Sequence, residues 1–431
     1  MSIAENIYDK LANSEDARFC EEIGEDACRA TPQSFVLILL SNFLTKLGDA
    51  IASPKTTLAW ITTAVGAPAF VLGFLVPIRE SGSMIPQLFI GGIVRRLAIR
   101  KWVWVIGSIG QCLCIAGIGI VALRIEGTAA GLAILGLIAL FSLARGFSSV
   151  AAKDVLGKTV PRKSRGRLTG WSASAAGLLS VGIGVALMLP AIAGQDSAWL
   201  GWLLIATAGL WLLAAGIYAQ VPESPGETDG GRSLVQSLQQ LRLLLNNKPF
   251  TRFVTTRALL MCSALSAPFY IALAQKSLGS PTRLLGAFVA AAGVASLVSA
   301  PIWGRFADSS SKWVMVAAAV ITASTGIVVF LVSQFLPGLN QTLWFLPLAY
   351  FVLSVAHSGV RVGRKTYVVN LATGNQRTDY VAISNSIIGV LLLVVGALGS
   401  LAPLIGNDGV IGLLALMGLS GAVLGTTLAN V

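Results

Sequence analysis

Long apolar stretches, separated by short polar segments, run along almost the whole chain. A helix needs about 20 mainly apolar residues to cross the hydrocarbon core of a bilayer, and stretches of this length recur from residue 34 to residue 429. The pattern predicts twelve membrane-spanning helices. We place them at residues 34–54, 67–94, 100–123, 129–153, 168–192, 199–219, 252–276, 284–306, 313–336, 342–365, 380–404 and 409–429.

The second predicted span carries two charges in its middle. Arg79 and Glu80 lie between Pro77 and Pro86, within an otherwise apolar stretch. A charge at the centre of a bilayer costs about 2.5 to 3.5 kcal/mol on insertion scales, so both side chains should face a bundle interior or a wet cavity. The prolines should bend the helix. The alternative is a span that ends at Pro77 and is followed by a polar loop.

Basic residues concentrate in alternate connections, whereas the other connections carry few charges, among them Lys55. By the positive-inside rule, this alternation places both termini in the cytoplasm and predicts a multi-pass protein of the bacterial inner membrane. The basic residues of the predicted inner connections are Arg95, Arg96, Arg100, Lys101, Lys158, Arg162, Lys163, Arg165, Arg167, Arg232, Arg242, Lys248, Lys312, Arg361, Arg364, Lys365 and Arg377.

Composition agrees with this interpretation. Hydrophobic residues make up 55% and charged residues 12% of the chain, which is too little polar surface for a soluble domain. The net charge of +12 lies in the inner connections, so it does not indicate nucleic-acid binding. The five cysteines show no metal-binding or redox spacing, and no Gly-rich phosphate loop or catalytic Ser/His/Asp order is present. We therefore expect no metal, no cofactor and no enzymatic activity.

The chain repeats weakly at an offset of 212 residues, the separation of Gly92 and Gly304. Such an internal repeat predicts two pseudo-symmetric halves of six helices each, in parallel orientation, with a binding site between them. The aligned pairs are Gly92 with Gly304, Arg100 with Lys312, Arg145 with His357, Lys153 with Lys365, Arg165 with Arg377, Ser174 with Ser386, and Gly177 with Gly389.

Four segments follow from the repeat. Residues 1–32 form an acidic cytoplasmic tail, and residues 33–219 form the N-terminal half. Residues 220–250 form a cytoplasmic linker, and residues 251–431 form the C-terminal half. Within the linker, leucines at helical spacing predict an amphipathic helix in the membrane interface. These leucines are Leu234, Leu238, Leu241 and Leu245.

With this organisation, the chain resembles the major facilitator superfamily of transporters over nearly its whole length. The family's signature between the second and third helices of each half combines a glycine, an acidic residue and basic residues. Arg96 stands where the family usually has aspartate, and Arg145 matches a buried arginine that the family often uses in proton coupling. The resemblance implies a cytoplasmic gate formed by Gly92, Arg96, Arg100, Gly304, Asp308 and Lys312.

The first span places polar groups on one helical face. Asn42, Lys46 and Asp49 are separated by steps of four and three residues, so their side chains share one face, which should line the bundle interior. This face is a candidate substrate or coupling site. The alternative is a structural role, in which Lys46 pairs with Glu80 and Asp49 pairs with Arg79.

Several side chains within the predicted spans are candidates for proton coupling or substrate binding. Asp49 and Glu80 are carboxylates that could exchange a cationic partner for a proton, and His357 is the only histidine and a candidate proton carrier. Arg79 and Arg145 could bind a carboxylate or phosphate. The spans of the second half are nearly uncharged in the sequence, and we expect them to supply hydrogen-bonding groups. These are Ser263, Ser266, Tyr270, Gln275, Asn385 and Ser386.

Two arginines at the start of the seventh predicted span, Arg252 and Arg257, are expected to extend to the lipid headgroups. From all these features we predict a monomeric secondary active transporter that works by alternating access within membrane lipids. The cavity charges favour a small anionic or zwitterionic organic substrate, with protons or another ion as coupling partner. The alternatives are a lipid or lysolipid flippase of the same fold and a non-transporting, receptor-like member.

Overall fold

The computed structural model describes residues 3–12, 29–189, 198–226, 228, 247–371 and 376–430. This part of the chain is helical throughout and contains no strand. The α-helices are α1 (Ile3–Ala12), α4 (Thr31–Ile51), α5 (Thr57–Ala64), α6 (Ala69–Met84), α7 (Gln87–Val94), α8 (Lys101–Arg124), α9 (Gly127–Thr159), α10 (Arg162–Met188), α12 (Ala198–Tyr218), α14 (Lys248–Leu259), α15 (Cys262–Leu265), α16 (Ala267–Leu278), α17 (Thr282–Ser309), α18 (Ser311–Phe335), α19 (Phe345–Leu371), α20 (Gln376–Gly396) and α21 (Ala402–Thr426). Two short 3-10 helices are η1 (Pro337–Gln341) and η2 (Ala397–Leu401).

The helices form twelve membrane spans. Ten stretches of the described chain are long and apolar enough to cross a bilayer. One of them, Ile383–Thr426, contains two spans, because the backbone turns at Gly406 with a φ of 79°. The broken pair α6 and α7 supplies a further span. The chain is therefore an integral, multi-pass membrane protein, and the predicted all-α, twelve-helix fold is confirmed.

Prolines lie at the breaks of two spans. The first span is interrupted at residues 52–56, around Pro54, and then continues as α5. In the second span Pro77 lies inside α6, and the break falls at Ile85–Pro86. The connection predicted around Lys55 is present as the non-helical residues 52–56, but it breaks the first span and does not separate the first span from the second. Such breaks are tolerated where the freed backbone groups face protein.

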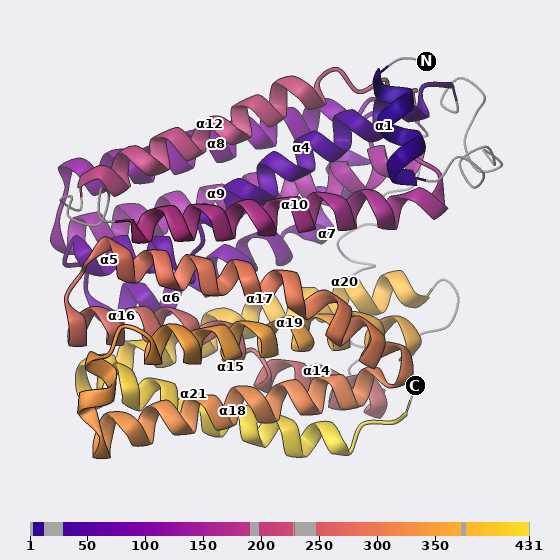
Figure 1. Ribbon diagram of the computed structural model, residues 1–431. Coiled ribbons are helices and arrows are strands. Elements are labelled where there is room, and N and C mark those ends of the chain that lie inside the picture. Colours follow the sequence, from indigo (N-terminus) through magenta and orange to yellow (C-terminus); the bar gives the residue numbers. More distant parts are fainter. Residues whose placement is uncertain are drawn as a thin grey trace.

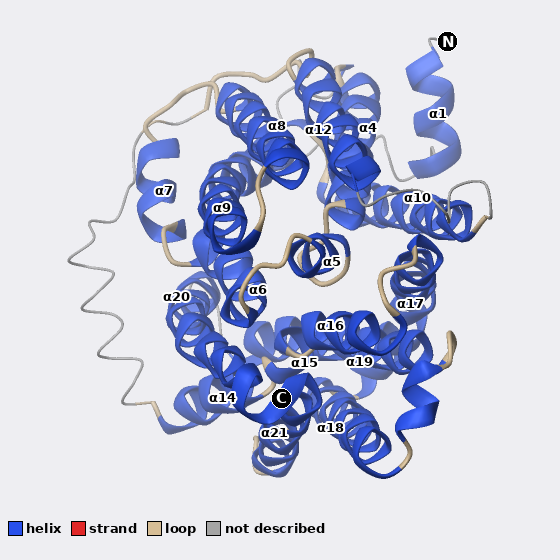
Figure 2. Cartoon of the chain, turned by 90° about the vertical axis from the view of Figure 1, so that its left-hand side faces the viewer, coloured by secondary structure: helices blue, strands red, loops and turns tan. Residues whose placement is uncertain are grey.

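The helices group into two bundles. Figure 1 shows α4, α8, α9, α10 and α12 in one group and α14 to α21 in the other, with both termini at the same end of the molecule. Two pairs of helices join the groups, α10 with α17 and α6 with α20. Figure 2, viewed from the opposite end, shows α5 near the centre, between α6 and α16.

Glycines allow the helices at both junctions to approach closely. A Cβ atom at Gly286 in α17 would lie only 2.6 Å from the carbonyl oxygen of Gly184 in α10. At the other junction, a Cβ atom at Gly73 in α6 would lie 2.8 Å from the carbonyl oxygen of Gly396. Small residues at such positions let membrane helices pack backbone to backbone, so these glycines determine how near the two groups can lie.

The N-terminal helix α1 packs on the first span. Tyr8 is 4% exposed, and its ring meets the ring of Phe35 edge-on at 5.1 Å. The remaining part of the predicted acidic tail, residues 13–28, and the predicted linker helix at 233–246 lie outside the described residues. Asn247, the last residue of that predicted linker helix, instead caps α14 by accepting a hydrogen bond from the backbone N–H of Phe250.

Candidate functional site

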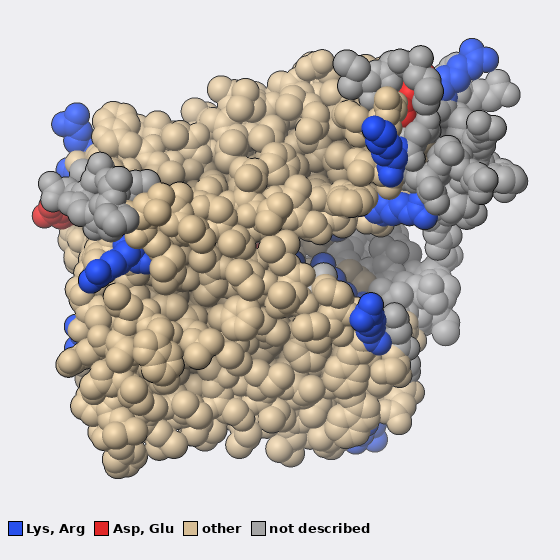
Figure 3. Space-filling view, viewed as in Figure 1, with Lys and Arg blue, Asp and Glu red and all other residues tan. Residues whose placement is uncertain are grey.

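A recess opens between the two helical groups at the end of the molecule that carries the termini. Figure 3 shows this hollow, with Lys or Arg side chains visible inside it, whereas the surface over the helices is almost free of charge. Uncharged outer surfaces suit a lipid environment, and ionisable residues inside a membrane bundle usually mark a substrate or ion pathway. The recess is therefore the candidate functional site.

A carboxylate shared by two arginines lies at the centre of the N-terminal group. Asp49, near the end of α4, contacts Arg79 of α6 at 2.7 Å and Arg145 of α9 at 2.8 Å. Arg79 also lies over the ring of Phe141, 4.3 Å from its centroid. The expected Asp49–Arg79 pair is thus present. Both arginines thus have an acidic partner, although the single carboxylate of Asp49 offsets only part of their combined charge.

Lys46 takes partners on another helix. Its Nζ donates to the carbonyl oxygen of Thr169 and to the hydroxyl of Ser172, both in α10 and both at 2.8 Å. The expected pairing of Lys46 with Glu80 is therefore wrong. Asn42 lies one turn before Lys46 on α4 and is partly buried, and its backbone carbonyl accepts a hydrogen bond from Thr45. This face thus joins α4 to α10.

The broken first span contacts the C-terminal group through Lys55. Its Nζ lies 2.7 Å from Nε2 of His357 in α19, and Nδ1 of the same ring lies 3.0 Å from the hydroxyl of Ser263 in α15. The ammonium group can only donate, so Nε2 accepts. Tyr350 donates to the backbone carbonyl of Lys55 at 3.4 Å. His357 is therefore held between the two helical groups.

The C-terminal group holds more positive charge than its sequence indicated. Arg257 of α14 is 6% exposed and donates to Ser384 at 2.7 Å and to Asn385 at 2.8 Å, both in α20. The expectation that Arg257 extends to the headgroups is therefore wrong, whereas Arg252 is exposed. Asn385 serves as the acceptor for this arginine, so the expected neutral binding surface is in fact built around a buried cation.

Three further cations lie on α19 beyond His357. The helix continues to Leu371, so Arg361, Arg364 and Lys365 belong to the helix and not to a loop. Arg364 is partly buried, while Arg361 and Lys365 are exposed. Glu80 of α6 lies within electrostatic range of Arg364 and Lys365. The two helical groups thus face each other across a strongly cationic space.

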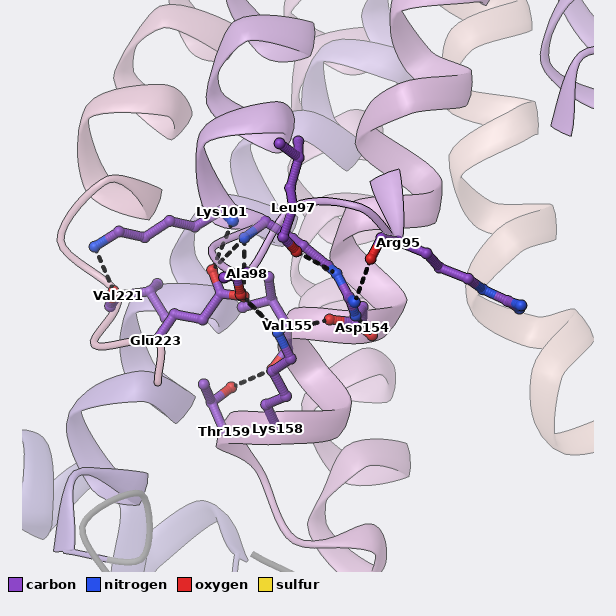
Figure 4. Close-up of polar contacts among 11 residues, drawn as sticks. Arg95, Leu97, Ala98, Lys101, Asp154, Val155, Lys158, Thr159, Val221 and Glu223 are labelled. Atoms are coloured by element: carbon purple, nitrogen blue, oxygen red, sulfur yellow. Dashed lines mark hydrogen bonds and ion pairs between the residues drawn. The ribbon is translucent and has the colours of Figure 1, made fainter. Parts of the chain in front are cut away.

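The connection between α7 and α8 is tied down by acids from elsewhere in the chain (Figure 4). The buried carboxylate of Glu223 accepts hydrogen bonds from the backbone N–H groups of Arg100, at 2.9 Å, and Lys101, at 2.7 Å. It also pairs with Lys158 at 3.0 Å. Asp154 pairs with Arg100 and with Lys158. Glu223 thus holds the start of α8 and links it to α9 through Lys158, and Asp154 of α9 adds a second link through Arg100. Arg96 is exposed.

The other expected gate residues lie at the same end. Gly92 in α7 and Gly304 in α17 have open space where a Cβ atom would stand. Lys312 is 8% exposed, and its Nζ lies 5.4 Å from the ring centroid of Trp313. The side chain of Asp308 lies outside the described residues. In the described part of the chain, no group of three His, Cys, Asp or Glu side chains is arranged to hold a metal ion.

Sequence and structure comparisons agree on the family. The sequence profile of the Major Facilitator Superfamily matches residues 38–321, and the chain belongs to this family. No curated protein matches the chain in sequence. The chain is thus a transporter and not an enzyme, as the resemblance of its motifs implied.

Solved structures share the fold at low sequence identity. A D-xylose–proton symporter is 16% identical, with a TM-score of 0.70 over 93% of this chain and 98% of that protein. The inward-open xylose transporter XylE from E. coli is 15% identical, with a TM-score of 0.66 over 92% and 95%. A mutant of the nucleoside transporter NupG is 11% identical, with a TM-score of 0.70 over 92% and 100%. These similarities establish the fold.

Sequence reasoning missed three residues of the site for different reasons. Lys55 follows Pro54, which indicated a turn, and the turn is a break within a span. Arg257 lies five residues inside the predicted span 252–276, too deep for a headgroup contact. Glu223 lies in a Pro- and Gly-rich stretch that indicated only a linker. For Arg257, its position five residues inside the predicted span could have indicated a buried side chain. For Lys55 and Glu223, only their contacts with other helices in the structure show that they belong to the site.

Proposed function

We propose that this protein is a proton-coupled secondary transporter of a small organic anion, which it moves by alternating access. One observation carries the proposal. Where the halves meet, nine Lys and Arg side chains and two acids, among those described, interact with one another. The cations are Lys46, Lys55, Arg79, Arg145, Lys153, Arg257, Arg361, Arg364 and Lys365, and the acids are Asp49 and Glu80.

Charge balance favours an anion over a neutral or cationic solute. Asp49 offsets part of the charge of Arg79 and Arg145 through direct contacts. Four of the cations, Arg257, Arg361, Arg364 and Lys365, belong to the C-terminal half, which supplies neither of the two acids. Confined cations with low-dielectric walls attract anions and raise their local concentration, and they repel a cationic solute by the same field. A zwitterion could use the carboxylate of Glu80 for its positive end.

Proton coupling is proposed to act through Glu80. Its carboxylate lies in the field of Lys55, Arg364 and Lys365, which is the same field that a bound anion would occupy. An ionised Glu80 and a substrate anion would repel each other and compete for these cations. Protonation of Glu80 removes the competition, so the proton raises the affinity for the anion and the anion raises the affinity for the proton. Coupled binding of this kind corresponds to symport.

Orientation and assembly complete the proposal. We place both termini in the cytoplasm of a bacterium, in the inner membrane, because basic residues are concentrated in the connections at that end. The recess then opens inward. The protein is proposed to act as a monomer embedded in membrane lipids, with the boundary between its two halves in residues 220–250.

Transport in proteoliposomes tests this function. A panel of organic anions, zwitterions and neutral solutes would be offered under an inward pH gradient, with uptake and internal pH recorded together. We expect uptake of an anion that is accompanied by proton entry and abolished by an uncoupler. Glu80→Gln should keep exchange of the solute but lose its accumulation. Glu126→Gln, which changes an exposed acid of the α8–α9 connection, should behave like the wild type.

Three results would contradict the proposal. Uptake confined to neutral or cationic solutes would overturn the anionic substrate. Accumulation that persists in Glu80→Gln would overturn the coupling role of Glu80. If folded protein moves no solute but exchanges lipid headgroups between leaflets, the flippase alternative replaces the proposal.

A further inference from the structure

Arg257 is buried without an acidic partner. The residue is 6% exposed, and its two terminal nitrogens donate to neutral oxygens of Ser384 and Asn385. Its Nε is also buried and has no hydrogen-bond partner. A guanidinium carries more N–H donors than these two bonds use, and a buried donor without an acceptor is costly, more so when it is charged. Arg257 therefore has an N–H donor that no acceptor of the described chain uses.

Two more arginines face the same space from α19. His357, Arg361 and Arg364 are separated by steps of four and three residues, so they lie on one helical face. Arg364 lies within electrostatic range of both Arg257 and Arg361. Like charges gathered inside a membrane bundle repel one another unless an anion lies between them. This face of α19 and the buried arginine of α14 thus lack a common counter-ion.

The acids of the recess do not supply that counter-ion. Among the described side chains, no carboxylate forms an ion pair with Arg257, Arg361 or Arg364. Asp49 forms ion pairs with Arg79 and Arg145 of the N-terminal half. Glu80 lies in the field of Arg364 but also in that of Lys55. If Glu80 offsets Lys55, none of the three arginines has an acid of the described chain to itself, which favours a ligand with more than one negative charge.

We propose that Arg257, Arg361 and Arg364 form the binding subsite for a doubly charged oxyanion of the substrate, such as a phosphate monoester. This deepens the proposed transport function and rests on it. Planar guanidinium groups bind phosphate through paired N–H donors, and Arg257 is held for this task by Ser384 and Asn385.

A matched pair of ligands tests the charge requirement. Binding of phenyl phosphate and of benzoate to the purified full-length protein would be measured at constant ionic strength and neutral pH. The two probes share an aromatic ring and differ in the charge of the anionic group. Phenyl phosphate should bind at least about tenfold more tightly, as expected for added hydrogen bonds to a charged group. Phenyl phosphate should then also be taken up by proteoliposomes.

Substitutions test the residues. Arg257→Gln and Arg361→Gln should each weaken binding of phenyl phosphate by about tenfold or more, with little effect on benzoate. Arg257→Lys should weaken it less, because the charge is kept while the paired donors are lost. Arg252→Gln is the matched control, since it removes an exposed arginine from the same helix. Arg361 is exposed, so its variant tests the subsite even if Arg257→Gln fails to fold.

The outcomes separate this inference from the transport function. Equal binding of phenyl phosphate and benzoate, or unchanged binding in folded Arg257→Gln and Arg361→Gln, would overturn the subsite. If a monoanion is nevertheless accumulated, the proposed function stands without it. Tight binding of phenyl phosphate that depends on these arginines, without any transport, would support the subsite and contradict the proposed function.

Discussion

The Nζ atom of Lys55 lies 2.7 Å from Nε2 of His357, and this contact joins the first span to α19 across the two halves. Two more bonds support it, from Tyr350 to the backbone carbonyl of Lys55 and from Gln275 to the backbone carbonyl of Trp60. All three attach the α5 region to the C-terminal half. Figure 2 shows α5 near the centre of the molecule at the end opposite the termini, so these bonds close the two halves onto each other there.

Removing the ammonium group of Lys55 should loosen this closure. Lys55→Met keeps the apolar stem but loses the bond to His357, which as a hydrogen bond to a charged group is worth about 1.5 to 3 kcal/mol. The backbone amides of α5 should then exchange with deuterium about ten- to a hundredfold faster. Lys276→Met, at an exposed position on α16, is the control. Unchanged exchange in α5 would show that the contact does not hold the two halves together.

Neutralising Asp49 should destabilise the N-terminal half. Asp49→Asn leaves Arg79 and Arg145 close together without an acid, and removing one partner of a buried pair costs about 3 to 5 kcal/mol. Because the Asp49 side chain is 27% exposed, we expect the lower end of this range and a clear fall in Tm. Arg145→Gln should be milder, since that side chain is 39% exposed. Measurement of Tm in detergent checks the order, and a milder loss in Asp49→Asn than in Arg145→Gln would contradict it.

Replacing Glu223 should release the α7–α8 connection. Its carboxylate is fully buried and accepts from two backbone N–H groups and from Lys158. Glu223→Gln removes the charge that these donors share, which costs about 1 to 3 kcal/mol for bonds of this kind. Proteolysis or deuterium exchange at residues 95–101 should increase, and transport should fall. Arg96→Ala is the control at an exposed position, and equal effects of both variants would contradict a specific role for Glu223.

The junction between α10 and α17 should not tolerate a side chain at Gly286. A methyl group there would meet the backbone of Gly184, and forced overpacking costs about 1 to 3 kcal/mol. Gly286→Ala should therefore lower Tm and reduce transport. Gly182→Ala is the matched control, because nothing lies within 4 Å of its Cβ position on the same junction helix α10. A Gly286→Ala protein as stable and active as wild type would mean that the halves do not need this close approach.

Much of the fold could be predicted from the hydrophobic pattern. Backbone groups in lipid must be satisfied within each segment, so long apolar stretches fold as helices whatever their neighbours are. The spans around residues 100–123 and 313–336 agree closely with α8 and α18. The breaks were harder to place, because Pro77 is accommodated inside α6 whereas Pro86 ends it. Which proline breaks a helix depends on what its surroundings offer the freed backbone groups.

The sequence by itself determined that this chain crosses the membrane many times as helices, and that charges such as Arg79 and Glu80 must face inward, because lipid excludes unpaired polar groups. Only the tertiary structure decided the partners. In the structure, Asp49 pairs with two arginines, and Lys46 donates to α10. Lys55 contacts His357, and Arg257 donates to neutral acceptors. The physical reason is that pairing energies depend on distances between helices far apart in the chain, which spacing along one helix does not specify.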